Sequence, residues 1–187
     1  DDLFKLTVNS DGTYRFDLIS AEQSYDETIT LSGLTAGGPV TWQELTSGRI
    51  EFVTDSANNG INTTSSTFGV DDSFIDPQEY FTMEFHNPGT TGDDDPWVNA
   101  DLLTAVTLDI AQVSHGPVDF SWEAIRYNTN GTVAATETGT FSVSGTGPIE
   151  IDPSISFSVL TITNIETPGT PTPQVKFGTD IAISRAV

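Results

Sequence analysis

The sequence predicts an all-β protein, an antiparallel β-sandwich with long loops. Apolar and polar residues alternate over short segments such as Val118–Ala124, which is the pattern of half-buried strands. Turn signals such as Asp11-Gly12 separate these segments. No longer window shows a convincing helical period. About a dozen short strands in a chain of 187 residues are typical of one β-sandwich.

The expected strands of the N-terminal half are short and end at turns. Asp11-Gly12 predicts a hairpin between the first two of them. Gly33 closes the third, and the polar residues 55–66, rich in Asn, Ser and Thr, predict a long loop. These strands cover residues 3–8, 14–18, 28–31, 50–53 and 80–85.

The C-terminal half continues the same pattern. Residues 102–110 are the one segment that also suits a helix, but their Val, Thr and Ile content favours a strand. Asn128–Gly131 predicts a turn, and the Pro-rich residues 167–173 predict a connector. The expected strands cover residues 102–110, 118–124, 138–144, 155–160 and 162–165, and residues 175–177 and 181–183 are expected to form one or two last strands.

The charge balance excludes several classes of partner. Six basic residues stand against 27 acidic ones, for a net charge of −21, which argues against nucleic acid and against an anionic membrane surface. No apolar run approaches the roughly 20 residues of a membrane helix, so no membrane insertion is expected. The chain has no Cys, which excludes disulfides. Most of the acidic residues are expected to form a solvated surface.

The most acidic window of the chain predicts a calcium site. Asp93, Asp94 and Asp95 are adjacent, and Asn99 and Asp101 follow on the same loop. Such oxygen donors at short spacing suit the coordination shell of Ca²⁺, although an exposed acidic turn is the alternative. Trp97 in this window is either a stacking platform for a ligand or a core anchor. We therefore take Trp97, Asn99 and Asp101 as candidate ligand-binding residues.

A second acidic window, residues 71–79, is the other candidate calcium site. Asp71 and Asp72 are favoured as ligands over Asp76, which stands before Pro77 and suits a turn cap. Glu79 could close a bidentate shell. A zinc or copper site is not expected, because the chain offers no Cys and only two His.

Several segments resemble the very large bacterial adhesins of the RTX class. Leu6–Leu18, with Asp11-Gly12-Thr-Tyr14 at its turn, is similar to a hairpin that recurs between modules of those adhesins. Residues 48–55, Thr67–Val70 and Ile75–Glu79 resemble the same proteins, in which such a run precedes a ligand-binding β-sandwich.

The resemblance implies a calcium-dependent module of a larger extracellular chain at a bacterial cell surface. It also implies a peptide-binding domain in which calcium helps to hold a free C-terminal carboxylate. In that family the module is embedded in a split domain. Residues 1–50 and 175–187 would then form a small second β piece built from both chain ends, around a ligand-binding sandwich at 51–174.

Two other functions remain open beside the peptide-binding one. Vicinal hydroxyls of a glycan could fill the same open calcium positions, and the module could also be a purely structural spacer stiffened by calcium. In the binding readings the partner is a peptide or glycan on another cell surface. The chain is not expected to be an enzyme, because His86 and His115 have no recognisable nucleophile partner. The acidic pair Glu84 and Glu123 could serve a glycosidase, but one suitable pair among 27 acids carries little weight.

Overall fold

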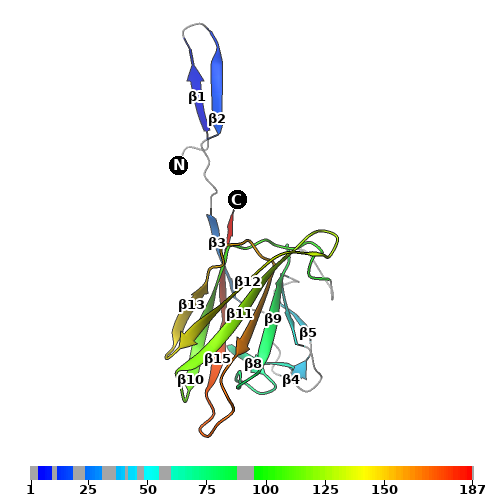
Figure 1. Ribbon diagram of the computed structural model, residues 1–187, viewed down its shortest axis with the longest axis vertical. Coiled ribbons are helices and arrows are strands. Elements are labelled where there is room, and N and C mark those ends of the chain that lie inside the picture. Colours follow the sequence, from blue (N-terminus) through cyan, green and yellow to red (C-terminus); the bar gives the residue numbers. More distant parts are fainter. Residues whose placement is uncertain are drawn as a thin grey trace.

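A computed structural model confirms the all-β antiparallel fold. It describes residues 4–9, 12–18, 24–30, 37–40, 42–45, 49–54, 60–87 and 95–186. Two large antiparallel sheets pack face to face, and a two-stranded hairpin stands at one end (Figure 1). The described residues contain no helix of the length and apolarity that a membrane crossing requires.

One layer is a seven-stranded sheet, and its central member is β15 (Gln174–Ala186). β15 pairs with β10 (Ala105–Ser114) along one side, and with β8 (Thr67–Val70) and β3 (Ser24–Thr30) along the other. The remaining members are β13 (Gly147–Ile151), β7 (Ile61–Thr63) and β4 (Gly37–Val40).

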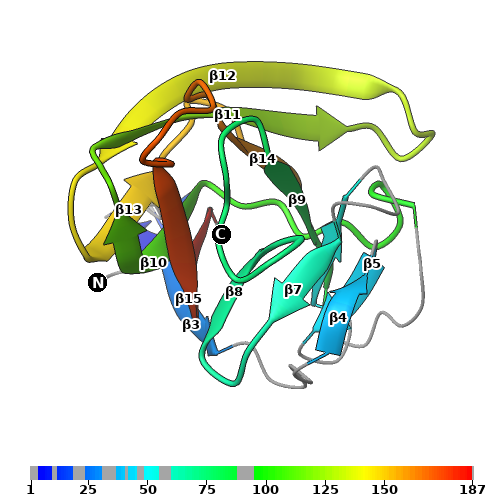
Figure 2. The same cartoon turned by 90° about the horizontal axis from the view of Figure 1, so that it is seen from below.

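The other layer is a six-stranded sheet, with strand order β12-β11-β14-β9-β6-β5. Figure 2 shows β11, β14 and β9 in this layer, opposite β10, β15 and β8. Its strands are β5 (Trp42–Leu45), β6 (Ile50–Val53), β9 (Tyr80–Phe85), β11 (Val118–Tyr127), β12 (Val133–Val143) and β14 (Val159–Asn164).

Aromatic side chains fill the space between the layers. Phe81 of β9 alternates inward with its strand neighbours, so its ring is fully buried. It meets Phe68 and Phe177 of the opposite sheet edge-on, with ring centroids 5.3 Å apart in both pairs. Phe68 also stacks on Phe177 at 5.5 Å. Each such pair is worth about 0.5–1.5 kcal/mol beyond the apolar area that it buries.

The observed strands depart from expectation in several places. Residues 61–63 form β7 although residues 55–66 were predicted to be a long loop, because they pair with β8. Residues 175–177 and 181–183, expected as one strand or two, belong to one strand, β15, which pairs with β10 across two register shifts. Residues 102–104 precede β10, and residues 155–158 precede β14, which extends to Asn164. β4, β8 and β13 were not expected either.

The boundary expected around a split domain does not coincide with a break in either large sheet. Residues 175–186 belong to β15, the central strand of the seven-stranded sheet. β5, from the expected N-terminal segment, pairs with β6 in the six-stranded sheet. The exception is the hairpin of β1 (Phe4–Val8) and β2 (Tyr14–Leu18), which forms a sheet of its own apart from the sandwich (Figure 1).

A tight turn after β8 rests directly on Gly69. Val70 donates its N–H to the Phe74 carbonyl at 2.8 Å, so the chain folds back over the strand. A Cβ on Gly69 would stand 2.5 Å from both the amide nitrogen and the carbonyl oxygen of Phe74. Backbone atoms cannot yield as a flexible side chain can, so the turn requires glycine here.

We expect Gly69→Ala to lower the free energy of unfolding by about 1–3 kcal/mol, because the added methyl displaces packed backbone. Urea denaturation followed by tryptophan fluorescence measures the change. The matched control is Gly145→Ala, where nothing lies within 4 Å of the added Cβ. Equal denaturation midpoints for the two variants would show that the turn does not press on Gly69.

Candidate functional site

The turn on Gly69 gathers the second acidic window of the sequence. Asp71 adopts a left-handed backbone conformation, with φ at 59°, and Gln78 does so at 71°. Such values are uncommon outside glycine and persist where the surrounding structure imposes them. Asp71 and Asp72 are exposed at the tip of the turn, and Asp76 and Glu79 are half-buried behind them.

Each of the last three carboxylates has a defined hydrogen bond. Asp72 Oδ1 accepts the Phe74 N–H at 2.6 Å, and Glu79 Oε2 accepts the Asp76 N–H at 2.7 Å. Asp76 Oδ1 accepts from Gln174 Nε2 at 2.9 Å, which ties the turn to the first residue of β15. The carboxylates are therefore held in place.

Burial and mutual repulsion raise the proton affinity of the inner carboxylates. Burial raises the pKa of Asp76, and the negative charges of Asp72 and Asp71 raise it further. The pKa of Glu79 is raised to about 7. Burial contributes most, the hydrogen bond from the Asp76 backbone opposes it, and the charges of Asp76, Asp72 and Asp71 add to the rise. A cation among these groups would replace the proton.

The first acidic window is only partly described. Asp93 and Asp94 lie outside the described residues. Asp95 is exposed, and its carbonyl accepts the Val98 N–H at 2.8 Å, so residues 95–98 form a turn. Asn99 is also exposed, with φ at 49°, and its carbonyl accepts from the backbone and side-chain nitrogens of Asn87.

Trp97 packs against Tyr127 of β11, in the six-stranded sheet. It is half-buried, 5.9 Å from the Tyr127 ring, and a Cβ on Gly131 would stand 3.0 Å from its indole. Gly131 has φ at 82°, so both its conformation and this close approach suit glycine. These contacts fit the role of an anchor for the loop.

Asp101 belongs to an ion-pair network. Its buried carboxylate accepts from Arg185 Nε at 2.8 Å and from Arg185 Nη2 at 2.6 Å. Arg185 and Arg49 both also donate to Glu27 of β3. The arginines lower the pKa of Glu27, Arg49 most strongly, and the Asp101 carboxylate is the main group that raises the pKa of Arg185.

The two acidic windows lie at opposite ends of β15. Asp76 contacts Gln174 at the start of that strand, and Asp101 contacts Arg185 near its end. Eleven steps of about 3.3 Å separate these contacts by roughly 30 Å or more. Asp101 therefore cannot share one metal ion with Asp71 and Asp72.

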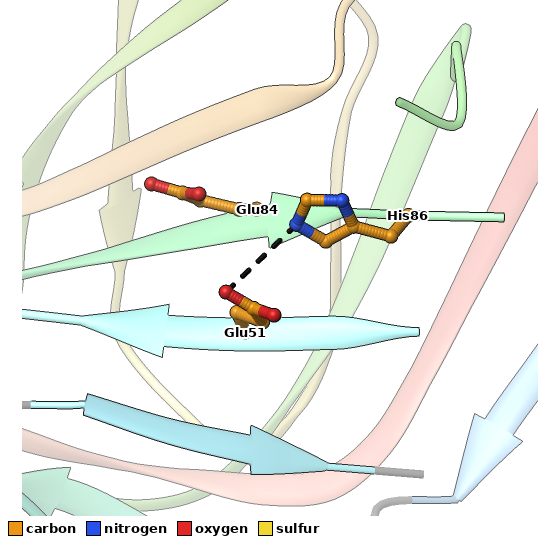
Figure 3. Close-up of side chains that lie close together, drawn as sticks. All are labelled: Glu51, Glu84 and His86. Carbon is orange, nitrogen blue, oxygen red and sulfur yellow. Dashed lines mark ion pairs between the residues drawn. The ribbon is translucent and has the colours of Figure 1, made fainter. Parts of the chain in front are cut away.

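A third group, formed by Glu51, Glu84 and His86, was not expected from the sequence. The three side chains converge on the outer face of the six-stranded sheet (Figure 3). One ligand atom from each lies within 4.8 Å of the others, and His86 Nε2 is 3.9 Å from Glu51 Oε2. Glu51 and His86 are fully buried, and Glu84 is half-buried.

The sequence carried part of the signal for this group. Glu84 and His86 are two residues apart, so their side chains share one face of a strand. Glu51 joins them because β6 pairs with β9 in a register that places Glu51 opposite Glu84. The alternation of apolar and polar residues in the sequence does not predict that register.

Tyr127 shares these surroundings. Burial raises the pKa of the Tyr127 hydroxyl, and the negative charges of Glu84 and Glu123 raise it further. The loop that carries Trp97 and Val98 therefore covers a charged patch of this sheet.

Comparison with family models, with curated proteins and with solved structures found no match.

Proposed function

We propose that this chain is a calcium-dependent, extracellular adhesin module that holds a ligand through a partly open Ca²⁺ site. The observation that carries the proposal is the turn at residues 71–79, where the charges of Asp71 and Asp72 lie close enough to raise the pKa values of Asp76 and Glu79. Crowded carboxylates and backbone oxygens on a constrained loop are the ligands that Ca²⁺ prefers. The order of RTX-adhesin-like segments in the sequence supports the same assignment.

Exposure of Asp71 and Asp72 suits a binding role for the metal. A calcium ion held from behind by half-buried carboxylates keeps coordination positions toward solvent. An anionic oxygen can fill such a position, so the favoured ligand is a peptide with a free C-terminal carboxylate. This route lets a chain with a net charge of −21 bind an anion.

We expect calcium to raise the melting temperature of the protein by several degrees relative to excess EDTA, and magnesium to do so much less. Free calcium at about 100 times its Kd stabilises the folded state by about 2.7 kcal/mol. Differential scanning calorimetry in each buffer measures the shift.

Asp72→Asn should abolish most of the calcium-specific rise, because it removes a charged ligand and keeps an oxygen that can accept the Phe74 N–H. The matched control is Asp152→Asn, which removes the same charge from an exposed loop. Identical melts of the wild-type protein in calcium and in EDTA would contradict the calcium proposal.

A pH series in EDTA tests the turn without metal. Because the pKa of Glu79 in the fold is about 7 against 4.5 unfolded, the native state holds an extra proton between these values. Its contribution to stability is present at low pH and is lost as pH rises from about 4.5 through 7. Glu79→Gln should therefore gain stability relative to wild type over that interval.

Urea denaturation at several pH values measures this difference. Glu150→Gln, at an exposed position of β13, is the control and should show no such trend. Calcium should suppress the trend in the wild-type protein, since the ion takes the place of the proton. A pH-independent difference between Glu79→Gln and wild type would contradict the assignment of Glu79 to the crowded site.

Peptide and glycan arrays probed in calcium should retain the protein on peptides with free C-terminal carboxylates, and amidation of those peptides should abolish retention. Retention on glycans alone would favour the carbohydrate-binding alternative. Failure on both arrays, with calcium stabilisation intact, would favour a structural spacer. The Asp72→Asn variant serves as the negative control on each array.

A further inference from the structure

The strand register brings two carboxylates together in the Glu51–Glu84–His86 group. Glu51 of β6 and Glu84 of β9 are direct cross-strand partners, which places their side chains side by side on the same face. Like charges in this arrangement destabilise a sheet unless a positive group lies between them. His86 lies on the same face as Glu84, two residues along the chain.

The hydrogen bond of His86 sets which nitrogen faces the carboxylates. His86 Nδ1 lies 2.8 Å from the Val98 carbonyl oxygen, and a carbonyl can only accept, so Nδ1 carries the hydrogen. In the neutral ring Nε2 then presents its lone pair toward Glu51. A backbone carbonyl that fixes a histidine in this way is the usual arrangement behind a metal-binding histidine.

His86 Nε2 has no hydrogen-bond partner among the described residues, although the side chain is fully buried. Its 3.9 Å separation from Glu51 Oε2 is too long for a hydrogen bond. A buried nitrogen without a hydrogen bond costs about 1–3 kcal/mol of folding stability. A further group bound to Nε2 would remove this cost.

We infer that Glu51, Glu84 and His86 bind a divalent transition-metal ion, with Zn²⁺ as the best fit. Metal–ligand bonds of about 2.0–2.2 Å place tetrahedral donor atoms roughly 3.4 Å apart. The observed 3.9 Å, with all donors within 4.8 Å, is slightly wider than that spacing. A small inward movement closes the site.

The donor set separates this ion from calcium. Ca²⁺ takes oxygen ligands in shells of six to eight, whereas one imidazole nitrogen and two carboxylates suit Zn²⁺. Three protein ligands also leave a fourth position for water or another group. Glu84 is half-buried while the other two side chains are fully buried, so the fourth position lies on the Glu84 side.

The alternative occupant is a proton. A protonated His86 between the two glutamates would form a closed ion pair and bind no metal. The two alternatives differ in zinc binding, because a protein in which His86 is held in the ion pair has no zinc site. A zinc titration therefore decides between them.

The test is isothermal titration calorimetry with ZnCl₂ on the untagged protein, stripped with chelator and then held in excess CaCl₂. We expect one zinc ion per chain. Glu84→Gln and His86→Gln should each weaken zinc binding at least ~10-fold, because even changes behind a metal ligand cost about 10- to 100-fold. Glu123→Gln, an exposed glutamate on β11 of the same sheet, should bind zinc as the wild type does.

Two further readouts keep the result independent of folding. Glu84 is half-buried, so Glu84→Gln should keep the melting temperature and the calcium response of wild type while it loses zinc. The visible spectrum of Co²⁺ in the zinc site should show four- or five-coordinate ligation that Glu84→Gln removes. No zinc binding by the wild type, or a zinc affinity in both ligand variants equal to that of the wild type, would overturn the inference. Neither result would bear on the calcium site, which the melts test separately.

Discussion

The structure depends on how it accommodates negative charge. A chain with 27 acidic and six basic residues cannot pair most of its carboxylates, so those that leave water need a specific partner. Asp101 is held by Arg185, whose guanidinium fits a carboxylate with two parallel donors. Glu79 accepts a hydrogen bond from a backbone N–H, and the pKa of its carboxyl group is raised, which favours the neutral form. Glu51 faces the one buried histidine of the described residues. Each solution lies at a different place on the sandwich.

β15 relates these places to one another. It lies in the middle of the seven-stranded sheet and supplies Phe177 to the aromatic core. Its first residue contacts the calcium candidate through Asp76, and its far end contacts the arginine network. Buried aromatic side chains fill the core between these ends, so the acidic turn rests on packed side chains. A turn supported in this way can hold its oxygens in one arrangement before any metal binds, which favours binding.

The fold class followed from the sequence because half-buried strands impose a strict alternation of apolar and polar residues. The continuity of β15 did not follow, since Gly178 breaks the apolar pattern. A Cβ on Gly178 would lie 2.8 Å from the Asp109 carboxylate of β10, a contact between strands distant in sequence. The acidic turn could be predicted because its four carboxylates are near neighbours in the chain. The roles of Asp101 and Glu51 could not, since Arg185 is 84 residues from Asp101, and Glu51 meets Glu84 only through strand register.

The pairing of β3 with β15 determines how the sandwich meets mechanical load. The two strands are antiparallel, and Ser24 pairs with Ala186, so the chain passes into and out of the sandwich at the same end. Tension applied through these two residues peels the strands apart one rung at a time, the weak direction for a sheet. The Glu27, Arg185 and Asp101 ion pairs lie within the first rungs of that seam and join it to the opposite sheet through Arg49. They form a clamp that must break before peeling can proceed, and salt, which screens exposed pairs more than buried ones, should leave most of its strength in place.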